Sequence, residues 1–414
     1  MLERELKRKT FKNALWLIAA QGVGKISKLL FFVLFARRLG SFKFGQFSFA
    51  LSFATFFVIF TDIGISPVFI KNYQKKTREE EVVSILGLKT LLAILVWATI
   101  ALTSLFFIKS SEIKELVLIL GGFVALESFL SLIFALFQAQ LTIHKQAILQ
   151  ALESILIATS GILVILRQPT LLVLACVYLG ARIAVLIIGF WWARVYIKIK
   201  ENCKNFWSGR IWARYVRESW PIFLSAFLMA VWANIDSVMM GFLGYLSDLG
   251  WYQAAYKIIS TLSLPISLIA IVFFPALNKA YNQSKKEFRG LFNLFYQITL
   301  SFALIIGILA FLGAKEIILI LYGREYFPAI LAFKILLFNT IFYMITLPLT
   351  HLFIISNRQK ILFAITFTAT VTNVLLNFFL IPSYSLYGAS IATVISSGIL
   401  FIGLFLFRKI PKVL

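Results

Sequence analysis

The chain of 414 residues is 61% hydrophobic and only 14% charged, whereas about 25% of the residues of a typical soluble domain are charged. With a mean hydropathy of +0.92 and repeated apolar runs of about twenty residues, the composition excludes a soluble catalytic domain and predicts an integral membrane protein. The net charge of +23 does not indicate nucleic-acid binding, because Lys and Arg collect in cytoplasmic loops and contact anionic lipid head groups.

The hydropathy pattern predicts an all-α polytopic membrane protein with about twelve transmembrane helices, and the alternating pattern of a β-barrel is missing. Gly313, Gly323 and Pro328 interrupt the pattern between the ninth and tenth predicted spans. A short interfacial helix within 313–328 is one possibility there. The predicted spans are 14–36, 44–70, 82–108, 116–141, 147–166, 171–197, 220–243, 250–277, 291–312, 329–356, 361–381 and 389–407.

The loops differ in their content of Lys and Arg. Most of these cations lie in the N-terminal segment, in the loops that follow even-numbered spans and in the C-terminal tail. Because cytoplasmic loops are enriched in Lys and Arg, the sequence predicts a protein of the cytoplasmic membrane with both termini in the cytoplasm.

The largest polar interruption, 198–218, combines many cations with Trp207 and Trp212. Such a composition predicts a basic amphipathic linker on the cytoplasmic face, which divides the chain into six-helix bundles at 1–197 and 219–414. A faint repeat supports this division. Leu39-Gly40 followed by Gly45-Gln46 in the first half corresponds to Leu243-Gly244 followed by Gly250 in the second half.

Charged residues also occur inside the predicted spans, where each costs roughly 2.5–3.5 kcal/mol at the bilayer centre. Most of them must therefore face a wet interior, and their excess of cations predicts a passenger with negative charge. The alternative is that these cations extend to the membrane surface or pair with buried carboxylates. The cations are Lys25, Lys28, Lys89, Arg182, Lys257 and Lys334, and the carboxylates are Asp62, Glu127, Glu153 and Asp236.

Several short segments appear in the same order as in a known family. They are ARRLG (36–40), FGQFS (44–48), DIG (62–64), WPIFLS (220–225), NID (234–236), YQAAYKI (252–258) and YGAS (387–390). In these segments the chain resembles the polysaccharide flippases, which export lipid-linked O-antigen or exopolysaccharide units and belong to the multidrug/oligosaccharidyl-lipid/polysaccharide exporter superfamily. The resemblance implies two six-helix bundles around a central cavity, alternating access and a polyprenyl-pyrophosphate-linked oligosaccharide as cargo.

A pyrophosphate linkage needs several positive partners, and Arg matches phosphate oxygens with two parallel hydrogen bonds. Lys25, Lys28, Lys89, Arg182 and Lys257 are therefore the expected substrate-binding residues. Lys25 and Lys28 lie three residues apart and share one face of the first span.

The carboxylates inside the spans are expected either to couple an ion or to form buried structural pairs. This expectation applies to Asp236, deep in the seventh span beside Asn234, and to Glu127 and Glu153. Gly and Pro in spans kink helices and can act as pivots. The predicted gate or hinge residues are Asp62, Gly64 and Pro221.

The sequence predicts no enzyme, no metal site and no cofactor, with coupling to H+ or Na+ left open. Gly24-Lys25 does not form a nucleotide-binding loop, because Ala19 replaces the first glycine and Ile26 follows the lysine. The expected partners are the lipid-linked glycan, membrane lipids, and the glycan polymerase and glycosyltransferases of the same pathway. Two other functions stay open: a multidrug or organic-cation antiporter with an acidic, aromatic cavity, and a membrane glycan polymerase or ligase.

Overall fold

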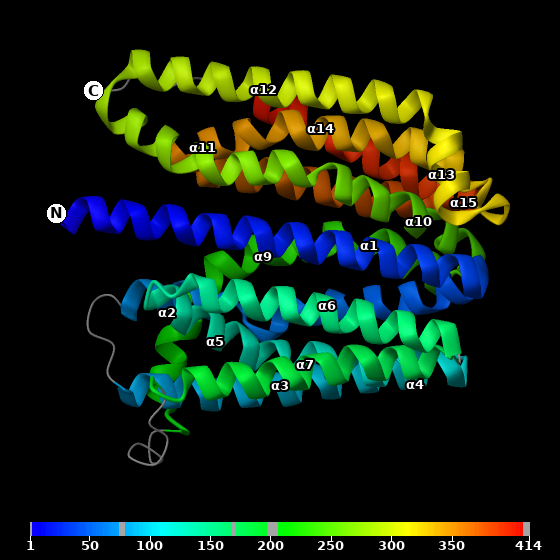
Figure 1. Cartoon of the computed structure of the whole chain (residues 1–414), viewed down its shortest axis with the longest axis horizontal. Helices are drawn as coiled ribbons and strands as arrows, with labels where there is room; N and C mark the ends of the chain where they lie inside the picture. The colour runs from blue at the N-terminus through cyan, green and yellow to red at the C-terminus, as the bar shows by residue number, and fades with distance from the viewer. Residues whose placement is uncertain (1, 74–78, 168–169, 197–205, 409–414) are drawn as a thin grey trace. The chain divides into compact units, whose positions relative to one another are not determined.

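The computed structural model describes residues 2–73, 79–167, 170–196 and 206–408. These residues form helices joined by short turns, and no strand occurs among them (Figure 1). Ten helices of this described part are long and apolar enough to cross a membrane. The prediction of an all-α multi-pass membrane protein is therefore confirmed.

Two of the ten helical segments are far longer than one crossing requires. Ala19–Tyr73 has 55 residues and Gln359–Leu406 has 48, whereas about 20 residues span the roughly 30 Å hydrocarbon core. Each is interrupted by residues with non-helical dihedral angles, as described below. The predicted count of twelve spans would follow if each crosses the membrane twice, and it stays a prediction.

The described chain divides into two compact units. The first contains α1 up to Phe31 and residues Gln46–Asn234, and the second contains Phe32–Gly45 and Ile235–Leu414. The elements that lie mainly in the first unit are α1 (Leu2–Phe56), η1 (Phe57–Thr61), α2 (Ile65–Tyr73), α3 (Glu79–Phe107), α4 (Ser111–Ala125), α5 (Glu127–Ala139), α6 (Ile143–Arg167), α7 (Leu171–Ala193) and α9 (Gly209–Phe242).

The second unit contains a short reversal of α1 and the C-terminal helices. Its elements after α9 are α10 (Leu246–Leu262), α11 (Leu264–Gln283), α12 (Lys285–Leu312), α13 (Ala314–Tyr322), η3 (Arg324–Tyr326), α14 (Ala329–Ile355) and α15 (Gln359–Leu406). The segment 313–328 therefore does contain a short helix, α13. Glu325 after it accepts a 2.6 Å hydrogen bond from the backbone N–H of Ser41, and Tyr326 donates one to the carbonyl of Ala36.

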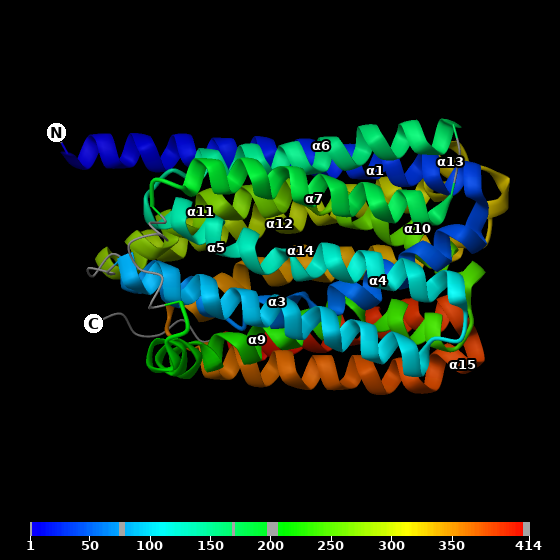
Figure 2. The ribbon, with the colours of Figure 1, turned by 90° about the horizontal axis from the view of Figure 1, so that it is seen from below.

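The chain reverses inside α1 at Gly40, whose φ of 77° lies in the left-handed region. The rings of Phe35 and Phe44 lie 5.4 Å apart across this point, whereas nine residues of straight helix would span about 13 Å. The chain also reverses inside α15, at Ser385, whose φ of 47° lies in the left-handed region (Figure 2). A Cβ on Gly388 would lie 2.2 Å from the carbonyl oxygen of Leu380, so the two arms of α15 meet directly behind the turn.

Of the predicted linker 198–218, residues 198–205 lie outside the described part, and the linker as a domain boundary stays a prediction. Residues 209–218 form the first turns of α9 instead of a separate surface helix. The side chains of Trp212 and Tyr215 contact α3, whereas most of the others are exposed. The indole N–H of Trp212 donates to the carbonyl of Ser84, and the hydroxyl of Tyr215 donates to Glu81.

Two glycines of the internal repeat allow backbones to touch within the second unit. A Cβ on Gly45 would lie 1.7 Å from the carbonyl oxygen of Leu246, and a Cβ on Gly250 would lie 2.0 Å from that of Ser41. Gly45 and Gly250 are corresponding positions of the repeat, and Leu246 and Ser41 also correspond. The contact is thus reciprocal, and only glycine fits on either side of it.

We predict that Gly45→Ala and Gly250→Ala each destabilise the protein by about 3 kcal/mol, because the new methyl group clashes with backbone that a side-chain rotation cannot move. Gly180→Ala in α7 is the control, since no atom lies within 4 Å of its Cβ position; there alanine should be neutral or slightly stabilising. Thermal unfolding in detergent checks this. Equal stability of the Gly45 and Gly180 variants would contradict the close contact.

Candidate functional site

Arg182 is a buried guanidinium that holds two carboxylates in the first unit. It lies on α7, and its side chain is 6% exposed. One terminal NH group donates to Glu127 on α5, and Nε lies 2.6 Å from an oxygen of Glu153 on α6. The guanidinium also covers the ring of Phe123, with 4.1 Å between Cζ and the ring centroid. A buried charge is tolerated when it is paired, and here two carboxylates share one cation.

Lys28 on α1 extends this group of charges. It interacts electrostatically with Glu153, Arg182 and Glu127. The four side chains, which we call the Arg182 cluster, balance two positive charges with two negative ones. The Glu127 side chain is 27% exposed and that of Glu153 is 12% exposed. Glu127 is therefore the more exposed of the two carboxylates.

Lys89 on α3 forms a second buried pair in the same unit. Its side chain is fully buried and its ammonium group contacts Asp62. The ammonium nitrogen also lies 2.9 Å from the hydroxyl of Ser131 and 3.4 Å from the carbonyl of Thr61. An ammonium has three protons, and each has an acceptor here. The sequence left two possibilities for each cation inside a span: to line a wet interior or to pair with a carboxylate. In this structure Lys89 pairs with a carboxylate.

Asp62 lies where η1 ends and α2 begins. Ile63 and Gly64 follow it with φ angles of 42° and 77°, which break the helix. Asp62 then accepts hydrogen bonds from the backbone N–H and the hydroxyl of Ser66 in the first turn of α2. It therefore caps α2 while it pairs with Lys89, which places a charge pair directly at a helix break.

The two other predicted hinge residues lie next to each other in the first unit. A Cβ on Gly64 would lie 2.9 Å from the carbonyl oxygen of Ser219 and 3.1 Å from Cβ of Ile222. Pro221 stands between these two residues inside α9. The break before α2 therefore packs against the part of α9 where proline removes a backbone hydrogen bond. Their role as a hinge stays a prediction.

Asp236 in the second unit is a buried carboxylate held by neutral groups. It is 7% exposed. Tyr252 on α10 donates a 2.6 Å hydrogen bond to it, Thr393 on α15 donates one of 2.7 Å, and the amide of Asn377 on α15 donates to its other oxygen. Asn377 also contacts the side-chain oxygen of Asn373 at 3.2 Å. Among the described residues, no Lys or Arg forms an ion pair with Asp236.

Three further predicted cations are Lys25, Lys257 and Lys334. Lys25 is a half-buried residue of α1, one turn before Lys28. Lys257 on α10 lies 4.6 Å from the ring centroid of Phe32, and Lys334 on α14 lies 4.9 Å from that of Phe311. The structure thus gathers Lys28 and Arg182 in one cluster and places Lys257 in the other unit. The binding roles of all these residues stay predictions.

Sequence reasoning did not identify several partners of these charges. Phe123 and Ser131 carry no signal in the sequence, because only the packing of α4 and α5 brings them to Arg182 and Lys89. Asn373 and Asn377 are four residues apart and share a helix face, which could have marked them as joint partners of a carboxylate.

Comparison with known proteins gives the family. A model described as "Polysaccharide biosynthesis protein" matches residues 10–281. The capsular polysaccharide biosynthesis protein CapF of Staphylococcus aureus is 25% identical over 239 residues, which are 58% of this chain and 59% of CapF. The match thus spans less than two thirds of the length of CapF.

Solved structures give the fold. The lipid II flippase MurJ, in an inward closed conformation, is similar with a TM-score of 0.78 at 18% identity, covering 96% of this chain and 88% of that one. An inward-facing multidrug resistance MATE family transporter of the MOP superfamily has a TM-score of 0.73 at 15% identity, with 93% and 94% covered. At these identities the likeness is one of fold alone. Because the family model matches well over half of the chain, the chain belongs to the polysaccharide biosynthesis protein family, as the sequence resemblance predicted.

Proposed function

We propose that this protein is a flippase that moves a polyprenyl-pyrophosphate-linked oligosaccharide to the outer leaflet of the cytoplasmic membrane by alternating access. Its family belongs to polysaccharide biosynthesis, and its fold is that of membrane transporters. MurJ, which shares the fold, is a lipid II flippase. These findings support transport in place of catalysis. Twelve spans and two cytoplasmic termini are part of the proposal.

The observation that carries the proposal is the balanced Arg182 cluster. Unpaired cations at this depth would be costly before cargo arrives, and Glu127 and Glu153 remove that cost. An arriving pyrophosphate offers Arg182 and Lys28 more negative charge and a bidentate geometry. We propose that it exchanges with Glu127, the more exposed carboxylate. The cluster then binds an anionic head group without leaving a bare cation in either state.

Within this proposal the other cations have different tasks. Lys25 lies one turn from Lys28 on the same face of α1 and adds positive charge beside the cluster. Lys89 has acceptors for all three ammonium protons, and we propose that it fixes the helix break at Asp62 and does not take the first contact with cargo. Lys257 would meet the head group later in the cycle.

We predict that Lys28→Gln lowers the flipping rate at least about tenfold, which corresponds to the loss of one charge-assisted contact of about 1.4 kcal/mol. Lys334→Gln is the matched control, since it removes the same charge from a span outside the cluster. The assay follows a fluorescent polyprenyl-pyrophosphate glycan in proteoliposomes that contain equal amounts of inserted protein.

A second variant separates cargo binding from simple loss of charge. Glu127→Gln leaves the cluster with an excess of positive charge, so cargo should bind more tightly and leave more slowly. Flipping at the normal rate by Lys28→Gln, or unchanged cargo affinity of Glu127→Gln, would contradict exchange at the cluster. A protein that instead expels organic cations and ignores the glycan would indicate an antiporter.

We also propose that Asp236 couples transport to H+ or Na+. Its carboxylate is buried among neutral donors, so a bound cation or proton would neutralise it. The side-chain oxygens of Asn373, Asn377 and Thr393 lie in the same group of contacts, and that of Asn377 is buried without a hydrogen-bond partner. Oxygen ligands of this kind suit a hard cation, which favours Na+.

We predict that flipping by the unaltered protein rises with an inward Na+ gradient and that Asp236→Asn removes this dependence, because the neutral amide no longer requires a counter-ion. Asp248→Asn is the control; Asp248 is a carboxylate of α10 that accepts a hydrogen bond from Ser385 at the turn of α15. The rate is measured with Na+ gradients and with pH gradients. A response to pH alone would assign H+, and an Asp236→Asn variant that keeps its ion dependence would contradict coupling at this residue.

A further inference from the structure

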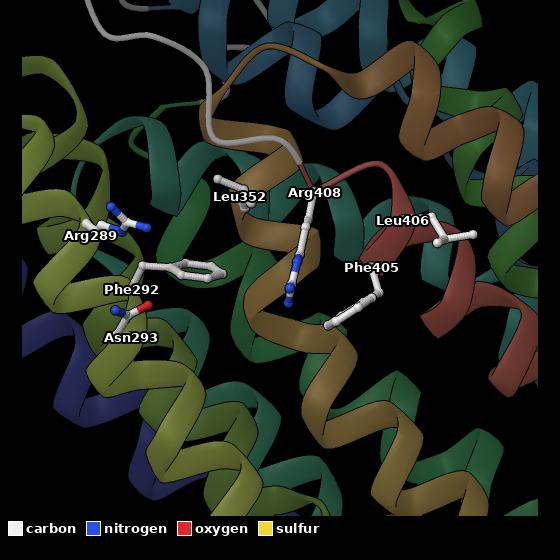
Figure 3. Close-up of a pocket in the computed structure, with 7 residues that line it drawn as sticks. All are labelled: Arg289, Phe292, Asn293, Leu352, Phe405, Leu406 and Arg408. Carbon is white, nitrogen blue, oxygen red and sulfur yellow. The ribbon is translucent and has the colours of Figure 1, made fainter.

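A cavity of about 640 Å³ opens in the second unit between α12, α14 and the end of α15. Figure 3 shows Arg289 projecting into it from α12 and Arg408 projecting from beyond α15, so that the two guanidinium groups approach the same space from opposite sides. Asn293 adds an amide one turn after Arg289. None of these residues belongs to the charge groups described above.

The cavity holds positive charge that the described protein does not neutralise. Among residues 2–73, 79–167, 170–196 and 206–408, no carboxylate lies within ion-pair distance of either guanidinium. Arg408 instead lies over the ring of Phe405, with 3.5 Å between Cζ and the centroid. Two arginines that converge on one space match the geometry of a phosphate group.

The other walls of the cavity are apolar. Phe292 and Leu352, which are buried, line it together with Phe405 and Leu406. Leu406 and Phe407 next to Arg408 are 69% and 53% exposed, which suits contact with acyl chains. A ligand that fits both parts therefore has an anionic phosphate joined to hydrocarbon.

We propose that this cavity binds the phosphate head group of an anionic glycerophospholipid of the cytoplasmic leaflet. Basic pockets between transmembrane helices on the cytoplasmic side commonly bind phospholipid head groups. The inference rests on the proposed orientation, which puts residues 278–290 and the C-terminal tail in the cytoplasm, but not on the identity of the transported cargo. Bound there, the lipid links the start of α12 to the end of α15 and stabilises the second unit.

The test uses the full-length protein in nanodiscs of phosphatidylglycerol or of phosphatidylethanolamine. The Arg289→Gln, Arg408→Gln double variant removes both guanidinium groups. The control is Lys285→Gln, Lys286→Gln, which removes two exposed charges from the same end of α12 but outside the cavity. We expect phosphatidylglycerol to raise the thermal stability of the unaltered protein and of the control, and the arginine variant to lose most of this gain.

Native mass spectrometry measures the bound lipid directly. We expect the affinity of the arginine variant for phosphatidylglycerol to be at least about tenfold lower than that of the control. A third variant, Arg289→Lys with Arg408→Lys, keeps the charge but loses the bidentate geometry and should lie between them. Equal losses in the Arg289→Gln, Arg408→Gln variant and in the Lys285→Gln, Lys286→Gln control would reduce the effect to general surface charge and overturn the proposal.

Two further arms identify the source of the phosphate. In the first, inorganic phosphate alone is added to the detergent-solubilised protein. If it stabilises the protein as much as phosphatidylglycerol does, the ligand is a soluble anion and the lipid proposal is overturned. Loss of glycan flipping in the arginine variant with unchanged binding of phosphatidylglycerol would assign the cavity to the cargo, which also overturns it. Because the lipid assays contain no glycan, failure of the proposed function leaves them interpretable.

Discussion

The structure of the first unit depends on one constraint: a charge placed in an apolar helix must find its opposite within the same unit. Arg182 holds Glu127 and Glu153, with Lys28 beside them, and Lys89 holds Asp62. Two cations thus form ion pairs with three carboxylates, and Lys28 adds a further positive charge near them. The ion pairs of Arg182 tie α7 to α5 and α6, and that of Lys89 ties α3 to the start of α2. In a membrane, apolar packing alone would give little preference for one helix neighbour over another.

In the second unit, the buried carboxylate of Asp236 is stabilised by neutral groups and not by a cation. Asp236 is satisfied by a phenol, a hydroxyl and an amide, and backbones meet directly at Gly45 and Gly250. A carboxylate among neutral donors can exchange a small cation, whereas a carboxylate paired with arginine is already neutralised. This contrast agrees with the proposed division of tasks, in which the charged groups of one unit would receive an anionic head group and Asp236 of the other unit would receive an ion.

The sequence predicted the helical fold well, because bilayer thickness sets the length of a span and apolar runs of that length are visible in the sequence. It also identified every buried charge discussed above. It could not pair them: Glu127 and Glu153 meet at Arg182 only because α5, α6 and α7 pack together. The predicted spans 361–381 and 389–407 left a break where Ser385 lies, but the residue type did not indicate left-handed backbone there, because serine rarely adopts it. The helix start at 209 was hidden because Trp212 resembles a membrane-surface anchor.

A double-mutant cycle at Lys89 and Asp62 tests the central claim most directly. The free energy of unfolding is measured for Lys89→Met, for Asp62→Asn and for the double variant. If buried charges are tolerated here only as pairs, each single variant strands a charge and loses about 3–5 kcal/mol, while the double variant loses less than either. Losses that simply add in the double variant would show that the two charges are stabilised independently, and would contradict the account.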